Sequence, residues 1–204
     1  MGVEFLFMGT ADIMRRQVIP PMTRFLAGVK QPRILDVACG TGRTLGQLAV
    51  AQPAAKCFGM DLSPYYLQVA REQLADVPDV SFVADNAERM PFRDDSFDVV
   101  TSTFLFHELP RNARRSVYAE MMRVLRPGGL LVIEDSAQLS EGGDLAVLFT
   151  QFAADFHEPF HADYVKDDIA TALSAAGFVV ESTEPCFLAK VVVARRPERS
   201  AQAA

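Results

Sequence analysis

The fold is decided by the stretch Ile34-Leu35-Asp36-Val37-Ala38-Cys39-Gly40-Thr41-Gly42. Its first residues predict a short buried strand, and its two glycines predict a tight turn that opens a helix. Small residues at such a turn let the backbone approach a bound ligand closely. The turn departs from the G-x-G-x-x-G pattern of dinucleotide sites, because Leu45 stands where the third glycine belongs and Gly46 follows one place late.

Strands and helices alternate outward from this turn. Short apolar runs predict strands over residues 33–38, 55–60, 80–84, 97–102 and 130–134. Periodic patterns predict helices over residues 41–51, 64–75 and 111–125, with Ser63 as the N-cap of the second, and Pro127-Gly128-Gly129 predicts a turn. This alternation indicates βαβ units, and therefore a mostly parallel sheet covered by helices on both faces.

The two ends of the chain follow other patterns. Residues 11–28 predict a helix with a break near Pro20-Pro21, and residues 145–156 and 163–176 predict two more helices. Two strands, 178–183 and 187–195, close the chain around a turn at Glu184-Pro185. So short a connection requires these two strands to be antiparallel.

The composition is that of a globular, acidic chain. Its 204 residues suit one α/β domain, and half of them are hydrophobic, which is enough for a sizeable core. A formal net charge of −6 repels phosphate backbones, so we expect no nucleic-acid partner. No apolar run approaches the ~18 residues of a membrane span, and there is no signal-peptide layout, so we expect no integral membrane association. Three widely spaced cysteines give neither a metal-ligand pattern nor a disulfide framework, and a reducing, cytoplasmic location is expected.

Acidic residues stand in or directly after three successive predicted strands. They are Asp36, Asp61 and Asp85. The carboxyl ends of parallel strands meet at one edge of a sheet, which is where open α/β sheets bind ligands. An acid at the position of Asp61 is placed to accept hydrogen bonds from ribose hydroxyls. We expect Asp85 to accept one from an adenine amino group, while the backbone amide of Asn86 meets a ring nitrogen.

Several motifs together resemble the class I S-adenosylmethionine-dependent methyltransferases. They are D-x-A-C-G-T-G at 36–42, G-M-D-L-S at 59–63, D-N-A-x-x-x-P-F at 85–92, F-D-V-V at 97–100 and R-V-L-R-P-G-G at 123–129. The group that contains the ubiquinone and menaquinone C-methyltransferases is the most similar. The resemblance covers residues 34–133, about half of the chain, and is specific as a set although each motif alone is weak.

The resemblance implies a fold, a cofactor and a set of cofactor-binding residues. The fold is a Rossmann-like α/β sheet of seven strands in the order 3-2-1-4-5-7-6, with strand 7 antiparallel and helices on both faces. The cofactor is S-adenosylmethionine, which leaves as S-adenosylhomocysteine after methyl transfer. Ala38 replaces the family's first glycine. By matched position the cofactor residues are Asp36, Ala38, Gly40 and Thr41 for the methionine end, Asp61 and Leu62 for the ribose, Asp85, Asn86 and Ala87 for adenine, and Thr103 near the sulfonium.

We expect one methyltransferase domain over residues 1–204. It divides into an N-terminal helical cap (1–30), the cofactor-binding core (31–135), a helical lid or substrate segment (136–177) and the closing antiparallel strands (178–196). The expected partner is a small-molecule methyl acceptor, possessing aromatic or lipid-like character, and the expected assembly is a monomer or a homodimer.

Several side chains allow a functional and a plainly structural interpretation. Asp36 either contacts the cofactor or only braces the turn. His107 is the candidate general base, since imidazole titrates near neutral pH, or it is a structural residue at the start of the next helix. A stripe of aromatic residues either packs in the core or covers the acceptor; it comprises Phe149, Phe152, Phe156, Phe160 and Tyr164.

A metal site and two other functions are weighed against this interpretation. His157 and His161 suggest a metal site, but Pro159 interrupts the helix that would align them and H-E-x-x-H is absent, so no metal is predicted. A non-catalytic S-adenosylmethionine-binding regulator or sensor is the main alternative function. A nicotinamide oxidoreductase is disfavoured by the misplaced third glycine.

Overall fold

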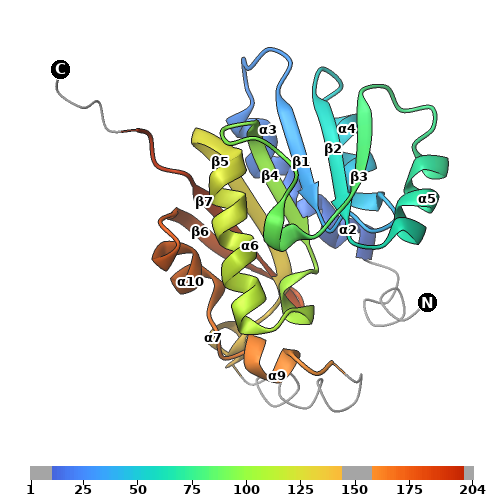
Figure 1. The fold of residues 1–204 in the computed structure, drawn as a ribbon. Helices are drawn as coiled ribbons and strands as arrows, with labels where there is room; N and C mark the ends of the chain where they lie inside the picture. Colours follow the sequence, from blue (N-terminus) through green and yellow to red (C-terminus); the bar gives the residue numbers. More distant parts are fainter. Residues whose placement is uncertain (1–10, 144–157, 200–204) are drawn as a thin grey trace.

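The computed structural model describes residues 11–143 and 158–199. A seven-stranded sheet lies at its centre, in the order β3-β2-β1-β4-β5-β7-β6 (Figure 1). The strands are β1 (Arg33–Val37), β2 (Lys56–Asp61), β3 (Val80–Ala84), β4 (Phe97–Thr103), β5 (Leu125–Ser136), β6 (Val179–Cys186) and β7 (Ala189–Arg195). Strands β1 to β5 are parallel, and β7 is antiparallel to both of its neighbours. The predicted fold class is confirmed.

The first face of the sheet is covered by helices from the start and the first half of the chain. These are α2 (Ala11–Arg15), the 3-10 turn η1 (Arg16–Val18), α3 (Ile19–Phe25), α4 (Arg43–Ala51) and α5 (Pro64–Gln73). Met22 of α3 and Leu48 of α4 pack in one core cluster with Ile34, Val99 and Val132 of the sheet. Alternate residues of β1, β4 and β5 therefore face this layer.

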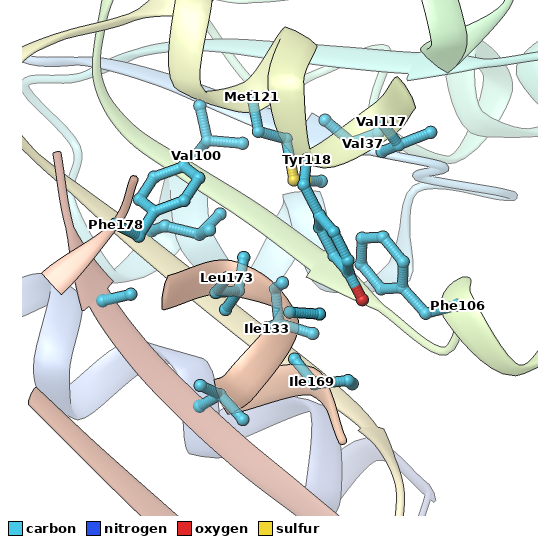
Figure 2. Close-up of a cluster of buried hydrophobic side chains, with 14 of the residues drawn as sticks. Val37, Val100, Phe106, Val117, Tyr118, Met121, Ile133, Ile169, Leu173 and Phe178 are labelled. Carbon is cyan, nitrogen blue, oxygen red and sulfur yellow. The ribbon is translucent and has the colours of Figure 1, made fainter. Parts of the chain in front are cut away.

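The second face is covered by helices from the later part of the chain. These are α6 (Arg111–Val124), α9 (His161–Tyr164) and α10 (Ile169–Ala175), with the short elements η2 (Ala87–Arg89), η3 (Phe106–Glu108) and α7 (Leu139–Gly142) at the sheet edges. Figure 2 shows Tyr118 and Met121 of α6 in one cluster with Val100 of the sheet and Leu173 of α10. Burial on both faces explains why the central strands are nearly continuous apolar runs.

Most predicted elements appear within two or three residues of their expected ends. Ser63 caps α5 as predicted, because its hydroxyl accepts a hydrogen bond from the amide of Tyr66 at 3.3 Å. Gly42 precedes α4 with a φ of 81°. Position 59 in β2 requires glycine, because a Cβ there would lie 2.7 Å from the sulfur of Cys39.

Three local predictions are wrong. The predicted 163–176 helix is two helices, because Asp168 caps a new helix at Ile169 by accepting from the amide of Thr171 at 2.7 Å. Pro127-Gly128-Gly129 lies within β5 as an irregular stretch opposite β4. The closing turn is at Phe187-Leu188, and Pro185 lies in β6, an edge strand where a missing N–H is tolerated.

The N-terminal break is also displaced. It lies at Arg16–Val18, before the two prolines, which instead occupy the first turn of α3. Proline is favoured there because the first amides of a helix have no carbonyl partner within it.

Candidate functional site

A cavity of about 730 Å³ opens at the carboxyl ends of β1 to β4. This volume is in the range of small-molecule and cofactor sites. Nine of the ten predicted cofactor residues line it: Ala38, Gly40, Thr41, Asp61, Leu62, Asp85, Asn86, Ala87 and Thr103. The sheet edge expected from the strand–turn–helix pattern is therefore where the cavity lies.

The turn between β1 and α4 forms one wall of the cavity. Ala38 and Gly40 both have left-handed backbones, with φ of 58° and 54°. A Cβ added at Gly40 would meet no atom within 4 Å, so the backbone faces open space there. Ala38 carries a methyl group in a conformation that favours glycine, which costs roughly 1–2 kcal/mol and accounts for glycine as the family's residue.

Asp61 joins this turn to the end of β2. One of its carboxylate oxygens accepts from the amide of Gly40 at 2.8 Å, and the other accepts from the amide of Ser63 at 2.8 Å. Each oxygen keeps acceptor capacity, because a carboxylate offers about four lone-pair sites. The carboxylate is thus fixed on the cavity wall and can still accept hydrogen bonds from a pair of hydroxyls.

The segment after β3 is organised by its own hydrogen bonds. The Asp85 carboxylate accepts from the amide of Asn86 at 2.7 Å, and the Asn86 side chain accepts from the amide of Glu88 at 2.8 Å. The Asn86 amide that we expected to meet a ring nitrogen is therefore bonded within the loop. A ligand at this position would exchange one of these local bonds for its own.

Helix α6 fixes the continuation of this loop. Glu120 accepts from the amide of Met90 at 2.7 Å, and Arg123 donates to the carbonyls of Met90 and Phe92 at 3.0 and 2.7 Å. The Glu120 and Arg123 side chains also pair with each other at 2.7 Å. This clamp holds the segment after Ala87 against the second helical layer.

Asp36 is the predicted cofactor residue that does not line the cavity. It is buried, and its carboxylate accepts from the Thr101 hydroxyl at 2.8 Å. Burial raises the pKa of Asp36 to about 7. The geometry favours the bracing role that the sequence left open, because Asp36 joins β1 to β4 beneath the turn.

A second buried carboxylate, Glu134, lies on the same face of the sheet. It stands on β5 opposite Thr103 of β4, and neither of its oxygens has a hydrogen-bond partner among the described residues. Burial raises the pKa of Glu134 to about 8, although the charge of Arg15 lowers it. Thr103 lines the cavity, and its hydroxyl oxygen is likewise buried without a hydrogen-bond partner among the described residues.

His107 is held by a carboxylate that the sequence did not single out. Its Nδ1 lies 2.6 Å from one oxygen of Asp135, the penultimate residue of β5. The other Asp135 oxygen accepts from the amides of Leu105 and Phe106 at 3.0 and 2.6 Å. Burial lowers the pKa of His107, but the charge and hydrogen bond of Asp135 outweigh it, so the pKa lies above its usual value.

The cavity wall next to His107 is formed by Glu108, the residue that follows it in the sequence. Glu108 lines the cavity, whereas His107 is 8% exposed and does not. One Glu108 carboxylate oxygen lies 3.9 Å from Nε2 of His107. Phe104, which also lines the cavity, has a left-handed backbone with φ of 58°, an uncommon conformation for a bulky residue that is often found at functional sites.

His107 lies close to a second histidine, His161 of α9. The ring centroids of His107 and His161 are 6.2 Å apart. Burial and the neighbouring His107 lower the pKa of His161 to about 4, so its ring is neutral at neutral pH. His157, together with Phe149, Phe152 and Phe156 of the aromatic stripe, lies outside the described residues. In the described ranges, no three His, Cys, Asp or Glu side chains lie close enough together to hold a metal ion.

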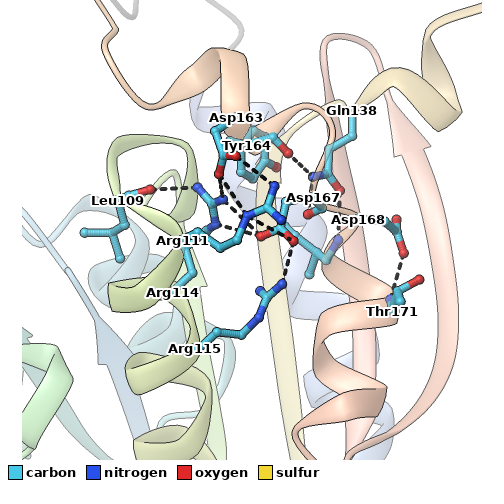
Figure 3. Close-up of polar contacts among 11 residues, drawn as sticks. Leu109, Arg111, Arg114, Arg115, Gln138, Asp163, Tyr164, Asp167, Asp168 and Thr171 are labelled. Atoms are coloured by element: carbon cyan, nitrogen blue, oxygen red, sulfur yellow. Dashed lines mark hydrogen bonds and ion pairs between the residues drawn. The ribbon is translucent and has the colours of Figure 1, made fainter.

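An arginine–aspartate network joins α6 to α9 beside this end of the site (Figure 3). It comprises Arg111, Arg114, Arg115, Asp163 and Asp167. Arg114 is fully buried and donates to Asp167 at 3.0 Å, to Asp163, and to the carbonyl of Leu109 at 2.7 Å. The network fixes the segment that follows residue 157 against the helix that follows η3.

Sequence reasoning missed Glu108, Asp135 and Glu134. Glu108 adjoins the candidate base in the sequence, but only the cavity distinguishes it from an ordinary surface acid. Asp135 and Glu134 continue an apolar strand into two consecutive acids, Glu134-Asp135, and that abrupt change was an available signal. Buried acids are rare without a partner or a function.

The residues at the cavity fit an S-adenosyl cofactor. Gly40 leaves open space beside the turn, Asp61 offers acceptors at the end of β2, and Thr103 brings a hydroxyl oxygen without a partner among the described residues to the end of β4. By place in the sheet these groups would meet the methionine end, the ribose and the sulfonium side of the cofactor. This arrangement defines a Rossmann-like ligand-binding protein.

Comparison with known proteins finds methyltransferases. Residues 34–129 match the family model described as a methyltransferase domain. The demethylmenaquinone methyltransferase of Chlorobaculum tepidum is 41% identical over 133 residues, which are 64% of this chain and 51% of that protein. The enzyme of the same name from Staphylococcus aureus is 34% identical over 128 residues, 62% of this chain and 50% of that protein. Over residues 34–129, which are just under half of the chain, the sequence therefore matches a methyltransferase domain.

The chain spans about half the length of the curated relatives it matches. Solved structures extend the likeness in fold beyond the matched segment. The CurJ carbon methyltransferase has a TM-score of 0.71 at 18% identity, with 93% of this chain and 56% of that chain covered. A SAM-dependent methyltransferase from Methanosarcina mazei has a TM-score of 0.70 at 18% identity, with 88% and 98% covered.

The described part of the chain contains no helix with the length and apolar character that crossing a bilayer requires.

Proposed function

We propose that this protein transfers the sulfonium methyl group of S-adenosylmethionine to a small-molecule acceptor. The observation that carries the proposal is the gathering of nine of the ten predicted cofactor residues around one cavity at the carboxyl edge of the sheet. The cofactor supplies an activated methyl group, so the protein's own task is to align the acceptor and exclude water. The acceptor is proposed to be aromatic or lipid-like, in keeping with relatives named for demethylmenaquinone.

Individual residues take stated parts in this proposal. Asp61 orients the ribose, Asp85 and the Asn86–Ala87 backbone hold adenine, and the turn at Ala38–Thr41 holds the methionine end. His107, fixed by Asp135, receives the proton of an acceptor that carries one. In this proposal segment 136–177 covers the acceptor. The protein works in the cytoplasm, as a monomer or a homodimer.

Calorimetric titration with S-adenosylhomocysteine tests the cofactor assignment. We expect micromolar binding by the wild type and at least tenfold weaker binding by Asp61→Ala, because the ribose hydroxyls lose both acceptor oxygens. Asp76→Asn, which removes an exposed acid in the turn after α5, is the matched control and keeps wild-type affinity. Absence of binding by the folded wild type would refute the proposal.

Methyl transfer from labelled S-adenosylmethionine into a metabolite extract separates an enzyme from a sensor. An enzyme yields a labelled small molecule, which then identifies the acceptor. Binding of S-adenosylhomocysteine without any labelled product would favour the non-catalytic regulator instead.

A further inference from the structure

We infer that Glu108 is the group that takes the proton from the methyl acceptor, and that the His107–Asp135 pair behind it is the proton's destination. The inference rests on the proposed function, since it assigns a proton path to the same cavity. Beside the expected role of His107, it assigns Glu108 to accept the proton and Asp135 to orient the imidazole. It also requires an acceptor whose reacting atom carries a proton.

The first step is access. Glu108 forms part of the cavity wall, and its side chain is 61% exposed. The His107 ring lies behind that wall, with its Nε2 atom 3.9 Å from a carboxylate oxygen of Glu108. A molecule in the cavity therefore meets Glu108 before it can meet the imidazole. Rotation of the exposed Glu108 side chain is the movement by which its carboxylate would reach hydrogen-bond distance of Nε2.

The second step is the orientation of His107. Asp135 is fully buried and accepts from the His107 ring at 2.6 Å, as well as from the amides of Leu105, Phe106 and Ser136. Four hydrogen bonds leave this carboxylate no freedom to turn. Its contact with Nδ1 fixes the tautomer in which Nδ1 carries the hydrogen and Nε2 is the free acceptor.

The third step is the balance of charge and protons. The acceptor atom gives one proton to the Glu108 carboxylate, which becomes a neutral acid and then returns to a carboxylate by passing the proton to Nε2. His107 ends as an imidazolium between Asp135 and Glu108. Desolvation at the cavity wall raises the pKa of Glu108 even though much of its side chain is exposed, and Asp135 raises the pKa of His107. Both groups therefore bind a proton more readily than usual.

Other charged or titratable groups face His107 and would modulate this path. His161 and Tyr164 of α9 lie with ring centroids 6.2 Å from the His107 ring, and the charge of Glu158 raises the pKa of His107. His161 is neutral near pH 7 and Tyr164 does not ionise there, because burial raises its pKa. Among the described residues, Asp135 and Glu108 are the negative groups that act most strongly on His107.

Nuclear magnetic resonance of the imidazoles tests the contact without any acceptor. The chain has only three histidines, and loss of a signal in His107→Gln assigns the relevant one. We expect Glu108→Gln to lower the pKa of His107 by about half a unit or more, as a charge about 4 Å away does even in water. Glu88→Gln, which removes another carboxylate from the cavity wall, leaves it unchanged.

The nitrogen shifts of the neutral ring test the positioning role of Asp135. We expect the Nδ1–H tautomer in the wild type and a mixture of tautomers in Asp135→Asn, whose amide can also donate. Thermal unfolding shows whether Asp135→Asn folds. If it does not, the effect of Glu108→Gln on the pKa of His107 still tests the inference. An unchanged His107 pKa in Glu108→Gln would overturn the inference.

Label transfer from S-adenosylmethionine into the metabolite extract tests the proton step itself. Glu108→Gln is expected to lose about 100-fold in turnover, a typical contribution of general-base catalysis, and to keep its S-adenosylhomocysteine affinity within about twofold. Wild-type turnover in this variant would refute the step. Failure of the proposed function is a different result, namely no S-adenosylhomocysteine binding by the wild-type protein.

Discussion

Glu134 shows at the scale of one residue how a buried acid makes stability depend on pH. The folded protein holds a proton on this side chain up to about pH 8, whereas an unfolded chain releases it near 4.5. Between these values the folded state binds more protons than the unfolded state. The free energy of unfolding contributed by this group therefore falls as pH rises.

Glu134→Gln removes this dependence, because an amide does not titrate. We expect the stability of the variant relative to wild type to increase as pH rises from 5 to 8, measured by urea unfolding at each pH. Asp36, whose pKa is raised to about 7, is present in both proteins and cancels in the comparison. A difference that stays constant with pH would show that Glu134 is ionised in the folded protein.

Ala38 adopts a left-handed backbone conformation that alanine disfavours, and neighbouring contacts hold it there. The family's glycine is replaced, yet the chain keeps the left-handed turn with φ of 58°. The amide of the next residue, Cys39, donates to the carbonyl of Met60 at 3.0 Å, and the Asp61 carboxylate accepts a hydrogen bond from the amide of Gly40. The local conformation is thus held from β2, which explains why the motif tolerates alanine.

At the scale of elements, the arginine–aspartate network decides how α6 and α9 sit together. Arg114→Met removes a fully buried guanidinium, and the Asp167 carboxylate, whose side chain is 8% exposed, keeps Arg115, whose side chain is 40% exposed. Breaking a buried pair in this way costs about 3 kcal/mol. Urea unfolding at neutral pH measures the loss.

Arg111→Met is the matched control for Arg114→Met. Arg111 contacts the same Asp163 from the same helix, but its side chain is 54% exposed. Exposed ion pairs contribute ~0–1 kcal/mol, so this variant stays close to wild type. Equal losses in the two variants would show that burial does not set the strength of the network.

At the scale of the whole molecule, the cavity links ligand binding to global stability. A ligand that binds only the folded state stabilises it by about 2.7 kcal/mol at 100 times its Kd. For a domain of this size that raises the melting temperature by roughly 5–10 °C. We expect S-adenosylhomocysteine to produce this shift in the wild type and a much smaller one in Asp61→Ala at the same concentration. A scan of melting temperature against ligand concentration measures it, and equal shifts in both proteins would place the ligand elsewhere.

The sequence by itself determined the strand–turn–helix around Gly40, the parallel core of the sheet and the position of the cavity. These features follow from local periodicity and glycine placement, which act over a few residues, while the full strand order came from resemblance to a family. The gathering of Asp61 and Asp85 was predictable because parallel strands end at the same edge. Asp36, which was expected there on the same ground, does not line the cavity, and Thr103 was expected there only from the family resemblance.

Only the tertiary structure decided the pairing of His107 with Asp135, the burial of Arg114 between Asp163 and Asp167, and the place of Glu108 on the cavity wall. The first two contacts join residues 28 and 49 to 53 positions apart. The division of the 163–176 helix has a local cause, the Asp168 cap, and a distant one, since Gln138 accepts from the amide of Ile169 at 2.9 Å. No local pattern encodes such partners, because they are chosen by which elements pack together after the sheet has formed.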